Sequence, residues 1–257
     1  MKRLLNKVAN FLFPIGLVAA LSTLAYFSAQ HQHGEPNVNR IRAPENVAPT
    51  SEVREGAIAS RLSVVKVVSL ATDEYELLAS SGTYVTLANR YFILTTAHGI
   101  NPDCDLIKFL SPMEGGQYID CKKVVVINAY TDYAIIEIEE IPQARAINIA
   151  TSVPNNREWE ESFAALNKLV YTGYPNNLGV VTIEGTVMGY FREDVVFLHS
   201  YGWAGASGSG VFDKNGHLVG FVAAILIGES EYGPDVLEDV VLVVPLFNIN
   251  WSIIYHR

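Results

Sequence analysis

Short apolar and β-branched runs, separated by polar turns, dominate the chain from Ala57 onward. Leu62–Leu70 alternates in part, and Ser81–Leu87 is followed by a turn at Ala88–Arg90 and by the run Tyr91–Thr96. Runs of this kind, bounded by Gly, Asn and Pro, are typical of β-strands. Further predicted strands cover residues 123–129, 133–138, 168–172, 180–190, 195–200, 210–212, 218–225 and 240–244. Many short strands without alternating helices predict an all-β barrel or sandwich.

Two stretches break this pattern. Asn156–Leu166 carries aromatic and apolar residues at helical spacing, and Phe247–Tyr255 has the same character at the end of the sequence. Both predict short helices whose apolar stripes pack against the sheets rather than bind a ligand. The first helix would separate two β halves, residues 57–145 and 165–247.

Residues 1–30 show a different pattern. Three basic residues precede an uncharged run from Val8 to Gln30, whose centre is almost wholly apolar. A positive start before an apolar run indicates a signal peptide or a signal anchor, and about 20 apolar residues suffice to cross a bilayer. We favour an uncleaved hydrophobic helix in the membrane over a removed signal. Either alternative predicts a folded domain outside the cytoplasm, in the periplasm or the extracellular space.

Residues 31–56 contain prolines and scattered charges but no apolar period, which predicts a flexible tether. His31 and His33 lie within it, and we expect a solvated linker there rather than a metal site. The predicted organisation is therefore a hydrophobic segment, a tether and one folded domain over residues 57–257.

Composition and charge exclude several classes of protein. The 257 residues are 49% hydrophobic and 18% charged, which is too apolar for a disordered chain. The net charge is −9, and it becomes −12 without the three basic residues of the N-terminal segment. An acidic chain of this kind is a poor nucleic-acid binder. Two cysteines are too few for a disulfide-stapled miniprotein or a four-thiolate zinc site.

The most informative segment for chemistry is the glycine-rich stretch around Ser207. Predicted strands flank it, and Gly205 permits backbone angles that turn neighbouring N–H groups toward one point, as an oxyanion requires. The stretch is not the G-x-S-x-G elbow of α/β-hydrolases, because Ser209 occupies the last position of that motif.

A serine nucleophile needs a base, and the base needs an orienting carboxylate. His98 follows an apolar strand and ends at a polar tip, whereas His199 is either a packed core residue or a wall of the substrate site. We expect His217, after a predicted hairpin turn, to be solvated, and His256 is the penultimate residue. Asp132 stands directly before the buried strand 133–138, where it is either a turn residue or the orienting acid.

Thr95-Thr-Ala-His98, Asp132-Tyr-Ala-Ile-Ile and Gly205-Ala-Ser207-Gly-Ser-Gly follow one another in the order His, Asp, Ser. Together they resemble the chymotrypsin-like (trypsin-like) serine proteases, in particular the compact bacterial HtrA-like protease domains. The resemblance covers residues 60–247 and implies two six-stranded antiparallel β-barrels with the active site in the cleft between them. The chain stops soon after the last predicted strand, so we expect no appended peptide-binding domain.

The resemblance also implies roles for individual residues. His98 would be the base, Asp132 its orienting acid and Ser207 the nucleophile, with the N–H groups of Gly205 and Ser207 as the oxyanion hole. No metal and no cofactor are implied. Ala223 stands where the family often has a serine near the aspartate, so Asp132 would rely on other donors.

The substrate-binding residues implied by the resemblance are Tyr201, Ala223, Ala224 and Ile225. Tyr201 is six positions before the nucleophile and is not acidic, so the pocket lacks a counter-charge for Lys or Arg. We expect small or medium apolar residues before the cut and strand pairing of the substrate with residues 223–225. The acidic stretch Glu229–Asp239 is predicted to be a loop, which either favours positively charged substrates or is merely solvated.

Cys104 and Cys121 flank a polar hairpin after His98. Outside the cytoplasm they would pair as a disulfide, and two free buried thiols are the alternative. The predicted function is a membrane-tethered, extracytoplasmic serine endopeptidase acting on protein or peptide substrates. A protease-fold binding module that has lost turnover is the main alternative, and a non-peptidase esterase is a second.

Overall fold

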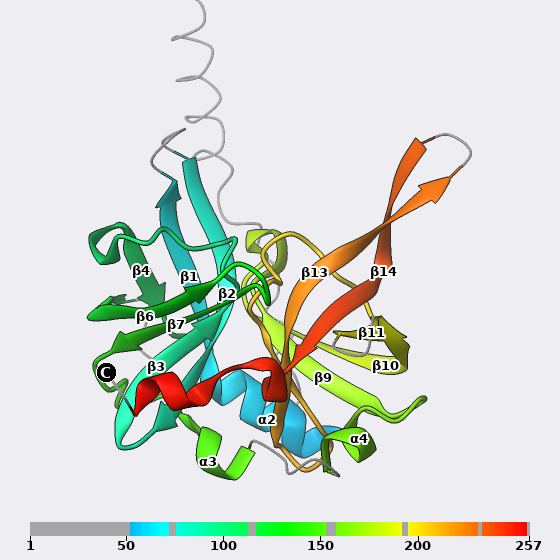
Figure 1. Ribbon diagram of the computed structural model, residues 1–257, viewed down its shortest axis with the longest axis horizontal. Helices are drawn as coiled ribbons and strands as arrows, with labels where there is room; N and C mark the ends of the chain where they lie inside the picture. Colours follow the sequence, from blue (N-terminus) through cyan, green and yellow to red (C-terminus); the bar gives the residue numbers. More distant parts are fainter. Residues whose placement is uncertain are drawn as a thin grey trace, which may run out of the picture. The chain divides into compact units, whose positions relative to one another are not determined.

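The computed structural model describes residues 52–71, 76–112, 117–152, 158–191, 195–230 and 233–255 (Figure 1). The predicted hydrophobic helix within residues 1–30 and the predicted tether up to residue 51 lie outside the described residues. Among the helices of the described segments, none is both long and apolar enough for a membrane span.

The first half of the domain is a sheet of eight strands, all antiparallel except for β8, which runs parallel to β2. The hydrogen-bonded order is β5-β4-β1-β2-β3-β7-β6, and β8 pairs with β2 outside this path. The strands are β1 (Val64–Ala71), β2 (Glu76–Leu87), β3 (Arg90–Thr95), β4 (Ile107–Leu110), β5 (Tyr118–Asp120), β6 (Lys123–Asn128), β7 (Tyr133–Ile138) and β8 (Ile147–Asn148).

This sheet corrects the prediction of a closed six-stranded first barrel, because its two end strands do not pair with each other. A flat sheet would hold β5 and β6 about 29 Å apart, since neighbouring strands are about 4.8 Å apart. Asp120 and Lys123 are nevertheless three residues apart in the chain, a reach of at most about 11 Å. The sheet therefore curls round, and the segment Cys121–Lys122 joins its two edges covalently.

The second half is a closed six-stranded barrel, as the resemblance implied. Its order is β10-β11-β14-β13-β12-β9, and β9 pairs with β10 to complete the ring. The strands are β9 (Lys168–Gly173), β10 (Val181–Phe191), β11 (Val195–His199), β12 (Gly210–Phe212), β13 (Leu218–Ser230) and β14 (Gly233–Pro245). Barrel strands β9 to β14 are drawn in yellow-green to red in Figure 1.

The long hairpin of β13 and β14 corrects a second prediction. Glu229–Asp239 is not a loop, because Ser230 pairs with Gly233 and the ladder continues toward the barrel. The two arms extend well past the other barrel strands (Figure 1). Val222 of β13 pairs with Val243 of β14, and the next residue of β13, Ala223, forms a β-bulge. A second register shift lies between Ile225 and Leu226.

Helix α2 (Arg54–Ser63) is a feature that the apolar pattern does not reveal. Its buried positions are Gly56, Ala59, Ser60 and Ser63, which follow helical spacing but are small or polar. A Cβ at Gly56 would lie 2.4 Å from the carbonyl oxygen of Asp213 after β12. The helix thus approaches the barrel so closely that only small residues fit, and it begins inside the predicted tether.

The two halves share one apolar core. Phe92 of β3 and Phe212 and Phe221 of the barrel are fully buried members of the same cluster. Each half also has its own cluster, around Phe109 and Ile136 in the sheet and around Phe163, Tyr171 and Val243 in the barrel. Because the shared cluster continues from β3 into β12 and β13, the two sheets pack as one body.

The remaining helices are short. α3 (Ile149–Ser152) follows β8, and α4 (Glu158–Ser162) covers only part of the predicted helix Asn156–Leu166. The predicted terminal helix Phe247–Tyr255 is instead two 3₁₀ turns, η4 (Leu246–Asn248) and η5 (Trp251–Ile254). Two further 3₁₀ turns are η1 (Cys104–Leu106) and η3 (Pro175–Asn177).

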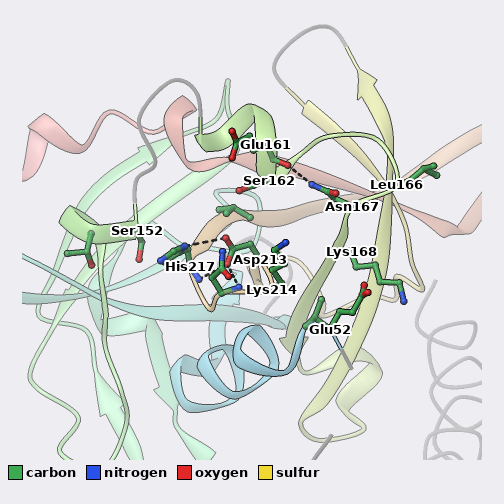
Figure 2. A pocket seen from close by; sticks show the side chains of 14 residues that line it. Glu52, Ser152, Glu161, Ser162, Leu166, Asn167, Lys168, Asp213, Lys214 and His217 are labelled. Atoms are coloured by element: carbon green, nitrogen blue, oxygen red, sulfur yellow. Dashed lines mark hydrogen bonds and ion pairs between the residues drawn. The ribbon is translucent and has the colours of Figure 1, made fainter. Parts of the chain in front are cut away.

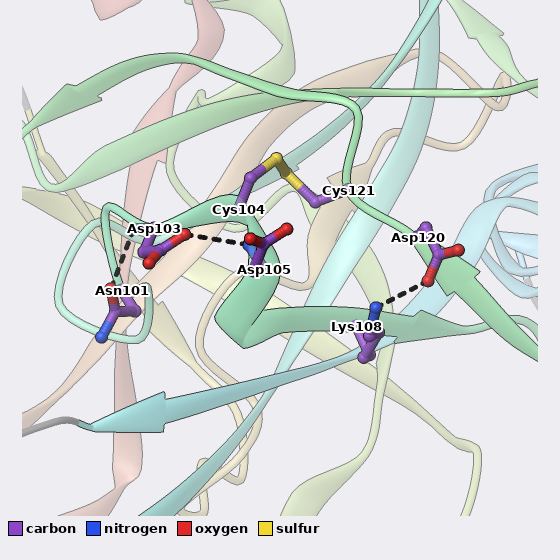
Figure 3. The surroundings of a disulfide bond; sticks show 7 residues. All are labelled: Asn101, Asp103, Cys104, Asp105, Lys108, Asp120 and Cys121. Carbon is purple, nitrogen blue, oxygen red and sulfur yellow. Dashed lines mark hydrogen bonds and ion pairs between the residues drawn. A yellow bond between two sulfur atoms is a disulfide. The ribbon is translucent and has the colours of Figure 1, made fainter.

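Cys104 and Cys121 form a disulfide in the structure (Figure 3). It closes the β4–β5 hairpin, in which Lys108 pairs with Asp120 and the two side chains lie 2.7 Å apart. η1 begins after Asp103, whose carboxylate accepts the N–H of Asp105. The bridge therefore fixes the point at which the edge of the sheet turns from β5 to β6.

Replacing both cysteines with serine should lower the free energy of unfolding by about 3 kcal/mol, because the bridge closes a loop with a sequence separation of 17. Urea unfolding of the double variant Cys104→Ser/Cys121→Ser measures the loss. Lys123→Ser, at the exposed start of β6, is a control for surface substitution. A double variant as stable as the parent would contradict a structural role for the bridge.

Candidate active site

Ser207 lies between β11 and β12, in a loop that needs two glycines. Gly205 and Gly208 have φ angles of +92° and +87°, which side-chain-bearing residues rarely adopt. A Cβ at Gly208 would lie 2.0 Å from the Ser81 carbonyl oxygen, and one at Gly205 would lie 2.6 Å from that of Tyr174. The loop is therefore pressed against β2 and against the segment after β9.

The peptide group before Gly205 has a fixed orientation. The carbonyl oxygen of Ala204 accepts the N–H of Asn176, with an N–O distance of 2.7 Å. In a trans peptide the C=O and the following N–H point in opposite directions. The N–H of Gly205 therefore points away from Asn176, and it donates to no acceptor in the part of the chain that the structure describes.

The peptide group before Ser207 is fixed in the same way. The carbonyl oxygen of Ala206 accepts the N–H of Ser209 at 3.0 Å, so the N–H of Ser207 points away from Ser209. No acceptor within the described segments takes this N–H either. The N–H between the two free ones, that of Ala206, donates to Trp203 at 3.0 Å. Two unused donors thus flank one that is occupied.

Ser81 of β2 is bonded to this loop at several points. Its N–H donates to the carbonyl oxygen of Ser207 at 2.9 Å, and its hydroxyl donates to that of Gly205 at 2.7 Å. The same hydroxyl accepts the N–H of Tyr174 at 2.9 Å. The Ser81 carbonyl oxygen accepts the hydroxyl of Thr95 on β3 at 2.7 Å. Ser81 thus links the serine loop of the barrel to two strands of the curled sheet.

His98 and Asp132 come from the ends of two paired strands of that sheet. Thr95 of β3 pairs with Ala134 of β7, so the residues just beyond them lie together. Asp132 Oδ2 lies 2.8 Å from His98 Nδ1, and Oδ1 accepts the backbone N–H of His98 at 3.0 Å. The N–H of Ala97 donates to the Asp132 carbonyl oxygen at 3.2 Å.

The backbone at Asp132 has a φ of +54°, a conformation that aspartate tolerates better than most residues. The turn before it is held by Asn128, whose side-chain oxygen accepts the N–H groups of Tyr130 and Thr131. Both carboxylate oxygens are bonded to His98, so the orientation of Asp132 does not need a hydroxyl at position 223.

The hydrogen bond to Asp132 raises the pKa of His98 above its ordinary value, and partial burial opposes this effect. The imidazole side chain is 53% exposed, so Nε2 remains open to a reactant. A base whose pKa is raised toward neutrality holds an accepted proton more firmly.

Ser207 and the strand that leads to His98 are linked through a shared neighbour, Ser81. Ser81 binds both the Ser207 carbonyl and the Thr95 hydroxyl, and His98 is three residues beyond Thr95. Within the described segments, the Ser207 hydroxyl makes no hydrogen bond to the imidazole. Such bonds are often long before substrate binds.

The predicted pocket residues lie beside this loop. Tyr201 is 62% exposed, and its ring stacks on that of Trp203 with ring centroids 5.8 Å apart. The sequence did not single out Trp203 as a residue of the site. Burial raises the pKa of Tyr171 to about 12, so its hydroxyl stays protonated and donates to the Tyr201 carbonyl. Ala223 is buried on β13 and directly follows Val222, whose backbone is hydrogen-bonded to the serine loop.

Ala224 and Ile225 continue the same strand and are partly exposed. A Cβ at Gly202 would lie 3.1 Å from Cγ1 of Ile225, so the segment that carries Tyr201 runs alongside β13. The segment that carries Tyr201 therefore lies next to the strand that carries Ala223, Ala224 and Ile225.

His199 and His217, the two other histidines among the described residues, lie elsewhere. His199 is exposed at the end of β11, which excludes a packed core role. His217 pairs with Asp213, with 3.2 Å between Nδ1 and Oδ2 (Figure 2). These two residues line a polar cavity of about 800 Å³ beside Ser152 and Glu161. This cavity lies at the end of β12 opposite to Ser207. The Asp213 carboxylate also accepts the backbone N–H groups of Asn215 and His217 in its own turn.

The domain thus consists of a closed barrel beside a curled sheet, with His98 and Asp132 at the ends of two paired strands of the sheet and Ser207 in a loop of the barrel. The family model of the trypsin-like peptidase domain matches residues 80–221, more than half of the chain. The chain therefore belongs to the trypsin-like peptidases, as the sequence motifs indicated.

Solved structures support the same fold. The serine endoprotease from Yersinia pestis matches with a TM-score of 0.58 and 21% identity, covering 77% of this chain and 63% of its own. The HtrA-type protease AlgW, solved with a tripeptide, matches with a TM-score of 0.62 and 18% identity over 80% of this chain and 64% of its own. The chain thus spans less than two thirds of either protein, and at these identities the likeness concerns the fold. No curated protein matches the sequence significantly.

The pKa of His98 should lie above 6.5 in the folded protein and fall toward that value in Asp132→Asn, because the amide cannot stabilise the charged ring. NMR titration of the imidazole measures both values. A folded pKa above the unfolded one stabilises the protein fully below the unfolded pKa, and this contribution is lost as pH rises through the folded pKa. An unchanged titration in Asp132→Asn would contradict the assigned cause.

Proposed function

We propose that this protein is a serine endopeptidase that hydrolyses peptide bonds through an acyl-enzyme. The observation that carries the proposal is the pair of unused N–H groups at Gly205 and Ser207, whose directions are fixed by the bonds of Ala204 and Ala206. Two fixed donors beside a serine suit an oxyanion. The His98–Asp132 pair, held near the same Ser81, supplies the base.

In the proposed mechanism, the Ser207 hydroxyl attacks the peptide carbonyl while its proton passes to His98 Nε2. Asp132 keeps the other ring nitrogen protonated and stabilises the imidazolium. The carbonyl oxygen becomes negative and accepts hydrogen bonds from Gly205 and Ser207. His98 then protonates the leaving amine, and a water molecule, deprotonated by His98, releases the acid from Ser207. Every proton is returned, so no cofactor is needed.

The proposed specificity pocket is formed by Tyr201, Ala223, Ala224 and Ile225. Its residues carry no charge and are mostly apolar, and Ile225 is bulky, which favours small or medium apolar residues before the cut. Its strand edge would pair with the substrate backbone. A cleavage profile dominated by basic or acidic residues at this position would contradict the preference.

We also propose that the protease domain works outside the cytoplasm, tethered through residues 1–30. The basic start and the long apolar run of that segment support this. The Cys104–Cys121 disulfide is consistent with it, because such bonds persist in oxidising compartments.

Ser207→Ala should lower turnover by about 10⁶, and Asp132→Asn by about 10⁴, by analogy with the Ser-His-Asp enzymes. Release of a fluorophore from a peptide with alanine before the cut measures both. Labelling by a fluorophosphonate probe should disappear in Ser207→Ala. A parent protein that neither turns over peptides nor takes up the probe would instead indicate the protease-fold binding module, and ester turnover without peptide turnover would indicate an esterase.

Ser81→Ala should lower kcat by about tenfold to a hundredfold with little change in KM, because it leaves the Gly205 carbonyl and the Tyr174 N–H without their partner. Ser80→Ala is a matched control. Ser80 is also buried on β2, but its hydroxyl has no partner within the described segments. Equal effects of the two substitutions, or a rise in KM alone at Ser81, would contradict a positioning role for Ser81.

A further inference from the structure

One edge of β13 is open along much of its length. β12 covers this edge only as far as Phe221, which pairs with Gly210. Val222 then exchanges two bonds with the serine loop, from its N–H to Ser209 and from Gly208 to its carbonyl oxygen. From Ala223 onward no described residue pairs with that edge, while β14 pairs with the other edge up to Ser230. The open edge spans about 26 Å at 3.3 Å per residue.

The backbone direction along this edge follows from one proline. Glu229 lies opposite Pro234 in the ladder with β14. Proline has no N–H, so this pair cannot be one in which both residues exchange hydrogen bonds. The N–H and C=O of Glu229 therefore point away from β14, toward the open edge. Backbone orientation alternates with a period of two along a strand, so the N–H and C=O groups of Ile227 and Ile225 also point toward the open edge.

The bulge at Ala223 gives the same result independently. Val222 directs both its backbone groups away from β14, toward the serine loop. One extra residue at Ala223 shifts the alternation by one, so the next residue in that orientation is Ile225. The register shift between Ile225 and Leu226 places its additional residues in β14, so β13 keeps its own alternation as far as Glu229.

This edge is continuous with the proposed active site. Gly208, whose N–H binds Val222, directly follows the proposed nucleophile. The pocket for the residue before the cut is formed around Ala223 to Ile225. Substrate residues further upstream are therefore the ones that reach Ile227 and Glu229.

In the proposed function the substrate backbone pairs with residues 223–225. We propose that this pairing continues along the open edge of β13 to Ile227 and Glu229, so that the enzyme selects extended segments with seven residues N-terminal to the scissile bond. The substrate is recognised through its backbone, with its first, third, fifth and seventh upstream residues opposite Ala223, Ile225, Ile227 and Glu229. An unfolded or strand-forming segment can satisfy this geometry, whereas a helix or a short peptide cannot. The inference rests on the proposed peptidase function.

Peptides that share the residues around the cut and carry three, five, seven or nine upstream residues test this inference with the full-length protein. We expect kcat/KM to rise about tenfold from three to seven upstream residues, since each added pair contributes backbone hydrogen bonds. Nine residues should give no further gain. N-methylation of the fifth upstream residue should remove the gain, whereas N-methylation of the sixth, which faces away from β13, should not.

A matched pair of variants tests the same edge on the protein. Ile227→Pro removes an N–H from the open edge of β13 without removing a bond to β14. Val236→Pro does the same on the outer edge of β14, because Val236 lies opposite Ile227. The ratio of kcat/KM between the seven- and three-residue peptides should fall toward one in Ile227→Pro and stay at the parental value in Val236→Pro.

The outcomes separate this inference from the proposed function. If no peptide is cleaved, the peptidase proposal fails. Cleavage with no length dependence, or with equal effects of the two proline variants, overturns the substrate edge alone. A change of oligomeric state in Ile227→Pro, measured by analytical ultracentrifugation, together with an absent length gain would assign the edge to a second copy and would also overturn it.

Discussion

The arrangement of the candidate site depends on the hydrogen bonds of Ser81. This residue lies on the curled sheet, yet it fixes the carbonyl groups of Gly205 and Ser207 in the barrel loop. A peptide plane fixed at one carbonyl is also fixed at the N–H of the next residue, so these bonds fix the N–H groups of Ala206 and Gly208. Their planes alternate along the loop with the planes that carry the two free N–H groups, those of Gly205 and Ser207. Thr95, three residues before His98, donates its hydroxyl to the Ser81 carbonyl, so Ser81 links the serine loop to the strand that leads to His98.

The packing between the two halves makes this contact rigid. Helix α2 approaches the barrel through Gly56, and its Ser60 hydroxyl lies 2.6 Å from that of Thr172 on β9. The shared core, which includes Phe92 of the sheet and Phe212 and Phe221 of the barrel, leaves little freedom for one sheet to slide on the other. Reacting groups contributed by different sheets benefit most from such packing, because small displacements weaken catalysis.

The sequence predicted most strands, the closed second barrel and the pairing of His98 with Asp132, because these motifs adjoin strongly apolar strands. It did not predict the short strands β4, β5 and β8, and the action of Ser207 together with this pair stays a prediction. It did not predict α2, since the buried face of this helix is made of Gly, Ala and Ser and carries no apolar period. Closure of the first sheet depends on how far it curls, which a strand pattern does not determine. The sequence predicts a loop at Glu229–Asp239 instead of the β13–β14 hairpin, because acidic and glycine residues obscure the period of two of these strands.

The hairpin is also asymmetric in a way that bears on its role. Open strand edges invite unwanted pairing, and proteins commonly blunt them with proline. Pro234 does this for β14, because the side on which its N–H is missing faces the outer edge. β13 has no proline between Ala223 and Ser230, so its edge keeps a full set of donors and acceptors next to the serine loop. One edge is thus protected and the other remains able to pair, as expected if only β13 binds an extended segment.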